Sequence, residues 1–217
     1  MTIESLVEMF RSNGNAEDAR AMDAYMKDHF PHLGIRTPQR RELQKSFLKL
    51  HPPQKEWIPI LWALPEREFQ LMAVDLLVGM KKKLTAADLP MVETVITNKS
   101  WWDTVDLIAS HVAGSIFRKD EDARRTFLKR WIESQNMWLN RTAILHQLTY
   151  KYDNDEALLY ECILPHIGSG EFFHQKAIGW ALREYAKVNP DAVKTFVATH
   201  QLKPLSVREA LKHFRES

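Results

Sequence analysis

The sequence predicts an all-α protein, and three observations support this prediction. Apolar residues recur at helical spacing along almost the whole chain, without a convincing alternating strand pattern. Glycine is scarce, with 7 residues in 217, while aliphatic and charged residues that suit helices are plentiful. Prolines fall where helices are expected to begin or end. The expected helices span residues 2–12, 16–29, 38–50, 54–63, 66–82, 87–97, 101–117, 121–134, 137–152, 155–166, 171–188, 190–200 and 205–214.

Prolines and glycines mark several of these helix boundaries. Pro38 opens a helix after Thr37, and Pro65 falls at the start of another. Pro190 follows Asn189, where it ends one helix and opens the next because the residue before proline disfavours helical geometry. Two glycines at 168 and 170 indicate a connection between the helices on either side.

Composition bounds the class of protein. The length predicts a core of useful size, and we expect a single domain over residues 1–217. The formal net charge is only +2, so a nucleic-acid surface would have to come from the arrangement of charges. One cysteine, Cys162, excludes a disulfide framework and fits a reducing cytoplasm. The first residues do not resemble a signal peptide, no apolar stretch is long enough to span a bilayer, and the nine histidines show no metal-binding pattern. We therefore expect a soluble cytoplasmic protein without a metal or cofactor.

The helices form pairs with an internal repeat. The second helices of successive pairs begin alike, as EREFQLMAVDLL, KSWWDTVDLIAS, NMWLNRTAILHQ and GEFFHQKAIGWA. Aligning Ala73, Val105, Ala143 and Ala177 gives steps of 32, 38 and 34 residues, the length of HEAT or TPR repeats. This spacing predicts a HEAT-like solenoid, a C-shaped stack of antiparallel helix pairs with a concave groove. An ordinary globular helical domain is the alternative.

The stretch SWWDTVD at residues 100–106 opens one of these second helices, and its residues divide by role. Ser100 and Asp103 have the spacing of a capping box. Trp102 and Asp106 lie four residues apart on one stripe, so both side chains can meet the same ligand. Alternatively, Trp102 covers the edge of the core and Asp106 is a solvated acid. The core stripe is expected at Trp101, Val105, Ile108 and Val112, and small residues that leave room beside Asp106 at Ala109 and Ala113.

Two other helices carry unusual polar residues. Arg141 lies in the first turn of its helix, where a cation opposes the helix dipole, so it needs an anionic partner. That partner is either an acid elsewhere in the fold or a phosphate. Further along, a tryptophan lies among cations on a face beside the core stripe, which is typical of nucleic-acid surfaces although lysine and arginine stems can also simply cover an edge tryptophan. This stripe consists of Lys176, Trp180, Arg183 and Lys187, beside a core stripe of Ile178, Ala181, Leu182 and Tyr185.

Corresponding positions of successive repeats line one face of a solenoid. We therefore expect Trp102, Asp106, Arg141 and Trp180 to converge in the concave groove. Other basic groups are candidate phosphate contacts, although such runs are more often solvated faces. These are Arg36, Arg40 and Arg41, and Lys81, Lys82 and Lys83.

The segments WWDTVD, MWLNRTAIL and EFFHQKAIGWALREYAK strongly resemble the AlkD-type alkylpurine DNA glycosylases, which are built of HEAT-like repeats. The stretches YMKDHFPHLGIRTPQRREL and LKPLSVREALKHF are similar to the same family, so the resemblance covers nearly the whole chain. It implies that Trp102, Asp106 and Trp180 are catalytic-cleft residues and that Arg141 faces a phosphate. It also implies further cleft or backbone contacts at Tyr25 and Arg183.

The resemblance implies removal of cationic N3- or N7-alkylated purines, such as 3-methyladenine and 7-methylguanine, from duplex DNA. A cationic purine needs no added proton to leave, so one carboxylate can suffice where ordinary glycoside hydrolysis uses two. Asp106 is the candidate that stabilises the oxocarbenium-like sugar and positions water. No lysine stands out as a Schiff-base nucleophile, so we expect a monofunctional enzyme that does not cleave the strand. We also expect it to act as a monomer. The residue pattern leaves open a non-catalytic binder of damaged DNA, and a peptide-binding HEAT scaffold.

Overall fold

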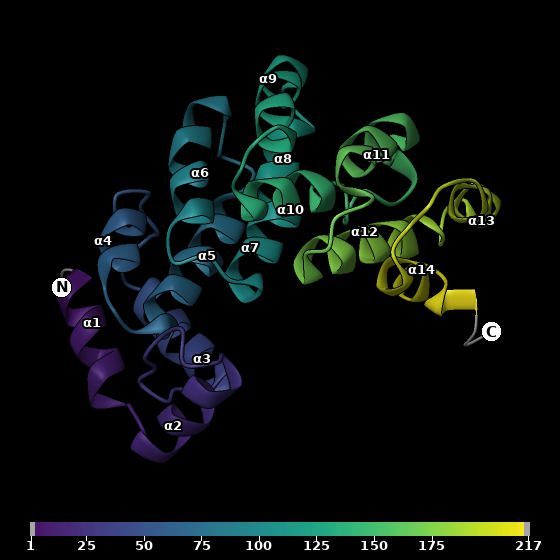
Figure 1. Cartoon of the computed structure of the whole chain (residues 1–217). Helices are drawn as coiled ribbons and strands as arrows, with labels where there is room; N and C mark the ends of the chain where they lie inside the picture. Colours follow the sequence, from purple (N-terminus) through teal and green to yellow (C-terminus); the bar gives the residue numbers. More distant parts are fainter. Residues whose placement is uncertain (1–2, 215–217) are drawn as a thin grey trace. The chain divides into compact units, whose positions relative to one another are not determined.

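The computed structural model describes residues 3–214, except the side chain of residue 213, and its regular structure is helical throughout that range (Figure 1). The prediction of an all-α repeat protein is confirmed. Packing divides the chain into an N-terminal unit that ends at Met80 and a C-terminal unit that begins at Lys81. The prediction that all 217 residues form a single domain stays a prediction.

From residue 3 on, the N-terminal unit contains five α-helices, each of which overlaps one of the segments expected to be helical. They are α1 (Ile3–Ser12), α2 (Ala16–Tyr25), α3 (Thr37–Leu48), α4 (Trp57–Ala63) and α5 (Arg67–Met80). The helix expected over residues 16–29 ends at Tyr25, because Lys27 and Asp28 adopt left-handed backbone conformations, with φ of 59° and 56°.

The C-terminal unit carries the longer part of the chain. Its α-helices are α6 (Leu89–Thr97), α7 (Trp102–Leu107), α8 (Gly114–Phe117), α9 (Glu121–Ile132), α10 (Met137–Leu145), α11 (Glu156–Ile163), α12 (Phe172–Tyr185), α13 (Pro190–Thr199) and α14 (Pro204–Ala210). Short 3₁₀ turns occupy Ala86–Asp88, Lys151–Asp153, Leu164–His166 and Lys212–Phe214. The helix expected over residues 137–152 is shorter than predicted, because turns follow Leu145 and Lys151 has a left-handed φ of 54°.

The repeat register proposed from the sequence coincides with burial. All four aligned residues are fully buried: Ala73, Val105, Ala143 and Ala177. Three residues before two of them, a buried side-chain amide occupies the same place. The Nε2 of Gln70 donates to the Leu64 carbonyl at 2.7 Å, near the end of α4, and the Nδ2 of Asn140 donates to the Trp131 carbonyl at 2.8 Å, at the end of α9. Each amide therefore satisfies carbonyls left open at the end of a preceding helix.

The segment expected as one helix over 101–117 is helical from Trp102 on, but it is not uniform. Between α7 and α8, Ile108–Ala113 forms a π-helix, in which hydrogen bonds close over five residues instead of four. The N-cap of α7 is Trp101, and its side chain makes no capping hydrogen bond, so the prediction of a capping box with Ser100 as N-cap is wrong. The Ser100 hydroxyl instead donates to the Ile96 carbonyl at 2.6 Å.

Candidate active site

Asp106 and Arg141 form a two-pronged ion pair in the C-terminal unit. The Nε of Arg141 donates to Oδ1 of Asp106 at 2.7 Å, and Nη2 donates to Oδ2 at 2.8 Å. The arginine side chain is 5% exposed and the aspartate side chain 13% exposed. Fork geometry of this kind is the strongest arrangement of a guanidinium and a carboxylate. Of the two partners left open by the sequence, an acid or a phosphate, the structure places an acid against Arg141.

Arg141 also connects to a third helix. Its Nη1 donates to the backbone carbonyl of Phe173 at 2.7 Å, and its guanidinium lies 5.6 Å from the centre of the Phe173 ring. Phe173 belongs to an aromatic cluster, with Trp101 at 5.1 Å and Trp138 at 4.9 Å between ring centres. Arg141 thus joins α7, α10 and α12, which run close to one another in Figure 1.

Burial dominates the electrostatics of Asp106. Loss of water around the carboxylate raises the pKa of Asp106 above its ordinary value of 3.8, and the negative charge of Asp103 adds to the shift. The guanidinium of Arg141 opposes the shift, because it stabilises the charged form. The result is a carboxylate that is a somewhat stronger base than a solvated aspartate and is fixed in orientation by two hydrogen bonds.

The two predicted cleft tryptophans are both half-buried in this unit. Trp102 lies one turn before Asp106 on α7, and Trp180 lies on α12 between the buried residues Gly179 and Ala181. Their convergence with Asp106 on one ligand stays a prediction. The prediction of open space beside Asp106 is wrong: Ala109 and Ala113 are fully buried, because the π-helical turn packs them into the core.

The basic stripe on α12 is paired with acids. Glu209 on α14 accepts from Lys176 and from Arg183, each at 3.0 Å, and Lys187, in the turn after α12, pairs with Glu184 at 2.7 Å. Burial alone would raise the pKa of Glu209, but the two cations outweigh it and lower that pKa below its ordinary value. The core stripe predicted beside these cations is confirmed, since Ile178, Ala181, Leu182 and Tyr185 are all buried. A role of Lys176, Arg183 and Lys187 in binding DNA stays a prediction.

The remaining candidates lie apart from this group in sequence. Tyr25 is largely exposed at the end of α2 in the N-terminal unit. Arg40 is buried against Asp75 at 2.7 Å, so its prediction as a surface phosphate contact is wrong, whereas its neighbour Arg41 is exposed. In the C-terminal unit, the backbone carbonyls of Lys81 and Lys82 accept hydrogen bonds from Lys119. No helix in the described part of the chain is long and apolar enough to cross a membrane.

Comparisons with known proteins identify the family of the chain. A sequence model of DNA alkylation repair enzymes matches residues 6–214. The chain belongs to the DNA alkylation repair enzyme family. A solved structure described as a predicted DNA alkylation repair enzyme from Enterococcus faecalis is 32% identical, with a TM-score of 0.85 over 94% of this chain and 98% of that one. No curated protein sequence matches the chain.

In this alkylation repair protein, some polar residues around the site were not foreseen from the sequence. Glu209 was overlooked as the partner of Lys176 and Arg183. His174 is buried between Ser169, at 2.8 Å, and the Asn140 side chain, at 3.2 Å. Burial lowers the pKa of His174 to about 4, which keeps it neutral at ordinary pH. The polar spacing of α12 gives no signal for the contacts to Glu209 and Asn140, because Glu209 lies 26 residues from Arg183 and Asn140 lies 34 residues from His174.

Proposed function

We propose that this DNA alkylation repair protein is a monofunctional alkylpurine DNA glycosylase. Its substrates would be cationic N3- or N7-alkylated purines in duplex DNA, of the 3-methyladenine and 7-methylguanine type, and its product an abasic site. The observation that carries the proposal is the mostly buried carboxylate of Asp106, held by the fork of Arg141 one turn after Trp102. The family supports a role in alkylation repair, and this geometry supports the hydrolysis.

One carboxylate is enough for this reaction. Alkylation at N3 or N7 makes the purine a cationic leaving group, so the glycosidic bond breaks without a proton donor. Positive charge then develops on the deoxyribose, and Asp106 stabilises it electrostatically. The same carboxylate orients or deprotonates the water that attacks the anomeric carbon. Its raised pKa suits a base more than the pKa of a solvated aspartate would.

Arg141 fixes Asp106 for this task. A fork of two hydrogen bonds defines the plane of the carboxylate, whereas a single bond would let it rotate. The arginine uses three of its N–H groups on Asp106 and Phe173. Two N–H groups remain for the phosphate contact that the sequence resemblance implies, since a guanidinium carries five.

The aromatic and basic residues would bind the DNA. Trp102 and Trp180 would hold the lesion deoxyribose and its cationic base, and a desolvated cation–π contact contributes about 1–2 kcal/mol. Arg183, Lys176, Lys187 and Tyr25 would contact the backbone. DNA affinity would then fall steeply with salt, because each phosphate contact releases counterions. We propose that the protein acts as a monomer without a cofactor; its cytoplasmic location is a prediction from sequence.

Base release tests the proposal directly. The protein is incubated in excess over methylated duplex DNA, and free 7-methylguanine and 3-methyladenine are measured over time. We expect release of both bases and an abasic strand that breaks only on later alkaline treatment. The Asp106→Asn variant should release much less, while Glu93→Gln, which also removes an arginine-paired carboxylate, should behave as wild type. Equal release by wild type and Asp106→Asn would remove the proposed role of Asp106.

The alternative function is a non-catalytic protein that binds damaged or distorted DNA. The observation that favours it is that the Asp106–Arg141 pair also serves as a structural link between α7 and α10. Binding to methylated duplex without any base release, under conditions where the folded protein is in excess, would support this alternative. A protein without salt-dependent DNA affinity would instead point to a peptide-binding scaffold.

A further inference from the structure

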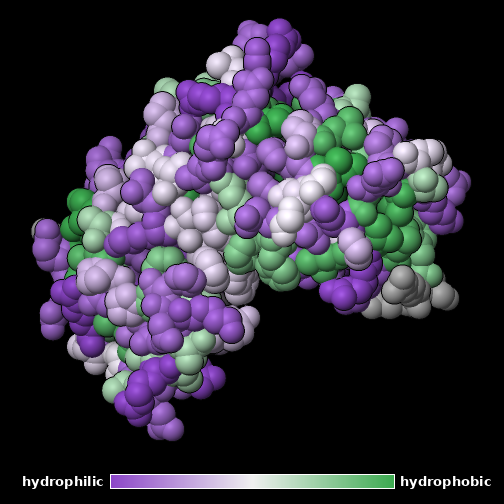
Figure 2. Space-filling view, viewed as in Figure 1, coloured by the Kyte–Doolittle hydropathy of each residue, from purple (hydrophilic) through white to green (hydrophobic). Residues whose placement is uncertain are grey.

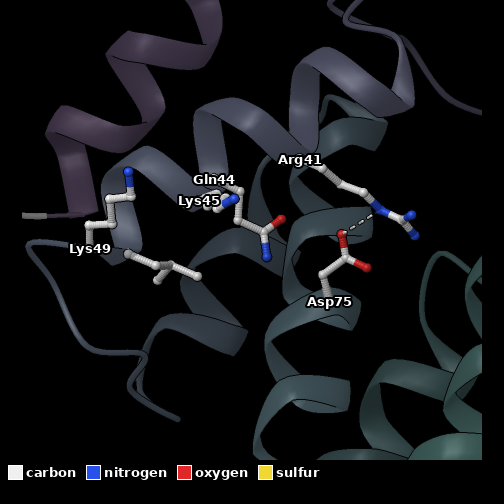
Figure 3. A pocket seen from close by; sticks show the side chains of 6 residues that line it. Arg41, Gln44, Lys45, Lys49 and Asp75 are labelled. Carbon is white, nitrogen blue, oxygen red and sulfur yellow. Dashed lines mark ion pairs between the residues drawn. The ribbon is translucent and has the colours of Figure 1, made fainter.

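A cavity in the N-terminal unit has the composition of an anion site. It is a shallow depression, widely open to solvent, with a volume of about 490 Å³, and lies between α3 and α5 (Figure 3). Three cations line it at four-residue spacing on one face of α3, together with one amide, one leucine and one carboxylate. The lining residues are Arg41, Lys45, Lys49, Gln44, Leu48 and Asp75.

The single carboxylate of the cavity, Asp75, is already paired with a buried arginine. Oδ2 of Asp75 accepts from the buried Arg40 at 2.7 Å, while the Nε of Arg41 stays 4.0 Å away, with its side chain 65% exposed. Counting Arg40, four cations and one carboxylate give the site a net charge of +3. The charge of Asp75 therefore does not cancel that of the exposed cations.

The exposed lysines of this cavity differ in their pairing from the basic stripe of Lys176, Arg183 and Lys187. Lys176 and Arg183 on α12 share Glu209, and Lys187, just after α12, pairs with Glu184. Within residues 3–214, Lys45 and Lys49 have no ion pair at all, although both are exposed. These two ammonium groups therefore remain available to a ligand.

The remaining polar group also favours an anion. The oxygen of Gln44 faces Arg40, whose Nη1 lies 3.4 Å away, and its amide nitrogen has no hydrogen-bond partner in the described part of the chain. In Figure 3 its amide lies between Lys45 and Asp75. The groups left open to a ligand are thus donors: one guanidinium, two ammonium groups and one amide. A donor set of this kind suits a phosphate.

We propose that this cavity, the α3 pocket, binds a backbone phosphate of duplex DNA outside the reacting nucleotide. A chain of phosphates fits a stripe of cations repeated along a helix better than a single small anion does, because successive cations can meet successive phosphates. On the face seen in Figure 2, hydrophilic residues predominate over the region that α2 and α3 occupy, with some apolar residues among them. The proposal rests on the proposed function only in taking DNA as the ligand.

The test compares two pairs of substitutions with the same loss of charge. Lys45→Gln combined with Lys49→Gln removes two cations of the α3 pocket. Arg125→Gln combined with Lys129→Gln removes two exposed cations at the same four-residue spacing on α9. Binding of unmodified duplex DNA is measured at several salt concentrations for wild type and both variants, and folding is checked by thermal melting.

We expect the α3 variant to bind more weakly than the α9 control, by about tenfold at low salt, with a salt dependence reduced by about one to two phosphate contacts. Equal affinity and salt dependence of the two variants would overturn the proposal. Inorganic phosphate distinguishes the sources of the anion: if it raises the melting temperature of wild type but not of the α3 variant, and DNA binding is unchanged, the site takes a free anion and the proposal is wrong.

Base release at saturating protein keeps the two proposals apart. The α3 variant should release methylated purines at the wild-type rate once the DNA is fully bound, because the pocket affects affinity and not hydrolysis. If no variant, and not even wild type, releases a base while the α3 variant still binds DNA more weakly than its control, the phosphate site stands and the glycosylase proposal fails.

Discussion

Two carboxylates in the C-terminal unit each pair with an arginine, yet the pairs differ in kind. Glu93 on α6 uses one oxygen, Oε2, for both Arg130 and, at 3.1 Å, the indole of Trp131. Asp106 uses both oxygens for the fork of Arg141. The side chain of Arg130 is 55% exposed, whereas that of Arg141 is 5% exposed.

The difference separates a surface contact from a site. An exposed ion pair contributes less than about 1 kcal/mol, because water screens it. A buried pair costs desolvation of both ions, so it is a poor way to gain stability, while loss of one partner is strongly destabilising. The same three residue types therefore stabilise a helix contact in one place and hold an oriented, partly buried carboxylate in the other.

The largest expected difference between the two pairs is in stability, when the arginine of each pair is replaced by alanine. Arg141→Ala leaves the Asp106 carboxylate buried without a partner, and we expect a loss of about 3–5 kcal/mol in unfolding free energy. Arg130→Ala should cost less than about 1 kcal/mol, because its partner Glu93 can turn to water. Chemical denaturation of both variants measures the difference. Similar losses for the two would show that burial does not distinguish the pairs.

Next in size is the loss of the charge on each carboxylate. Asp106→Asn should lower single-turnover release of 7-methylguanine by about 10²–10³-fold, the usual cost of losing one electrostatic stabiliser. Glu93→Gln should stay within about twofold of wild type, since its carboxylate pairs with Arg130 and the indole of Trp131 and with no residue of the proposed site. Both rates are measured with excess protein on the same methylated duplex. A comparable decrease in both variants would mean that the substitutions act through folding and that Asp106 has no special role in base release.

The tryptophan near each carboxylate should also differ in role: Trp102 in base release and Trp131 in stability. Trp102→Phe weakens an aromatic contact to the lesion, and we expect base release to fall by about fivefold, within the range of a cation–π contact. Trp131 is fully buried and donates to Glu93, so Trp131→Phe should lower the melting temperature and leave release at saturation unchanged. Release and melting curves for both variants test this. The prediction fails if Trp102→Phe alters only the melting temperature.

The smallest expected effect is a shift in pH dependence. The reaction needs Asp106 as a carboxylate. The rate of base release should therefore be highest above the pKa of Asp106 and should fall as the pH drops through that pKa. Because burial raises that pKa, the midpoint should lie above 3.8. The rate is measured from acid to neutral pH after subtraction of spontaneous depurination. In Asp106→Asn this acid limb should disappear, and its persistence would assign the limb to another group.

Periodicity predicted the fold well, because it reports burial directly. Val105, Ile178 and Leu182 were placed in the core by their spacing, and all three are buried. The same method separated Trp102 and Asp106 from the core stripe. Past Leu107 the π-helical turn changes the spacing, so a regular helical wheel misplaced Ala109 and Ala113.

Side-chain pairs between segments far apart in the chain could not be predicted from the sequence. Arg141 was expected to need an anion, but its partner lies 35 residues away, and neither residue identifies the other. Arg40 and Arg41 are adjacent and chemically identical, yet one is buried and the other exposed. Only the packing of α3 against α5, through the Arg40–Asp75 bond, decides which of them remains at the surface.

Gly114 begins α8 beside the end of α10, where any side chain would overlap the backbone carbonyl of His146. An obstacle made of backbone cannot rotate aside, so a larger residue there would displace one helix along or away from the other. These two helical runs also carry the two halves of the Asp106–Arg141 fork. A random mutagenesis library screened for lost base release should therefore recover position 114 together with 106 and 141, although a glycine has no side chain to contribute to the chemistry.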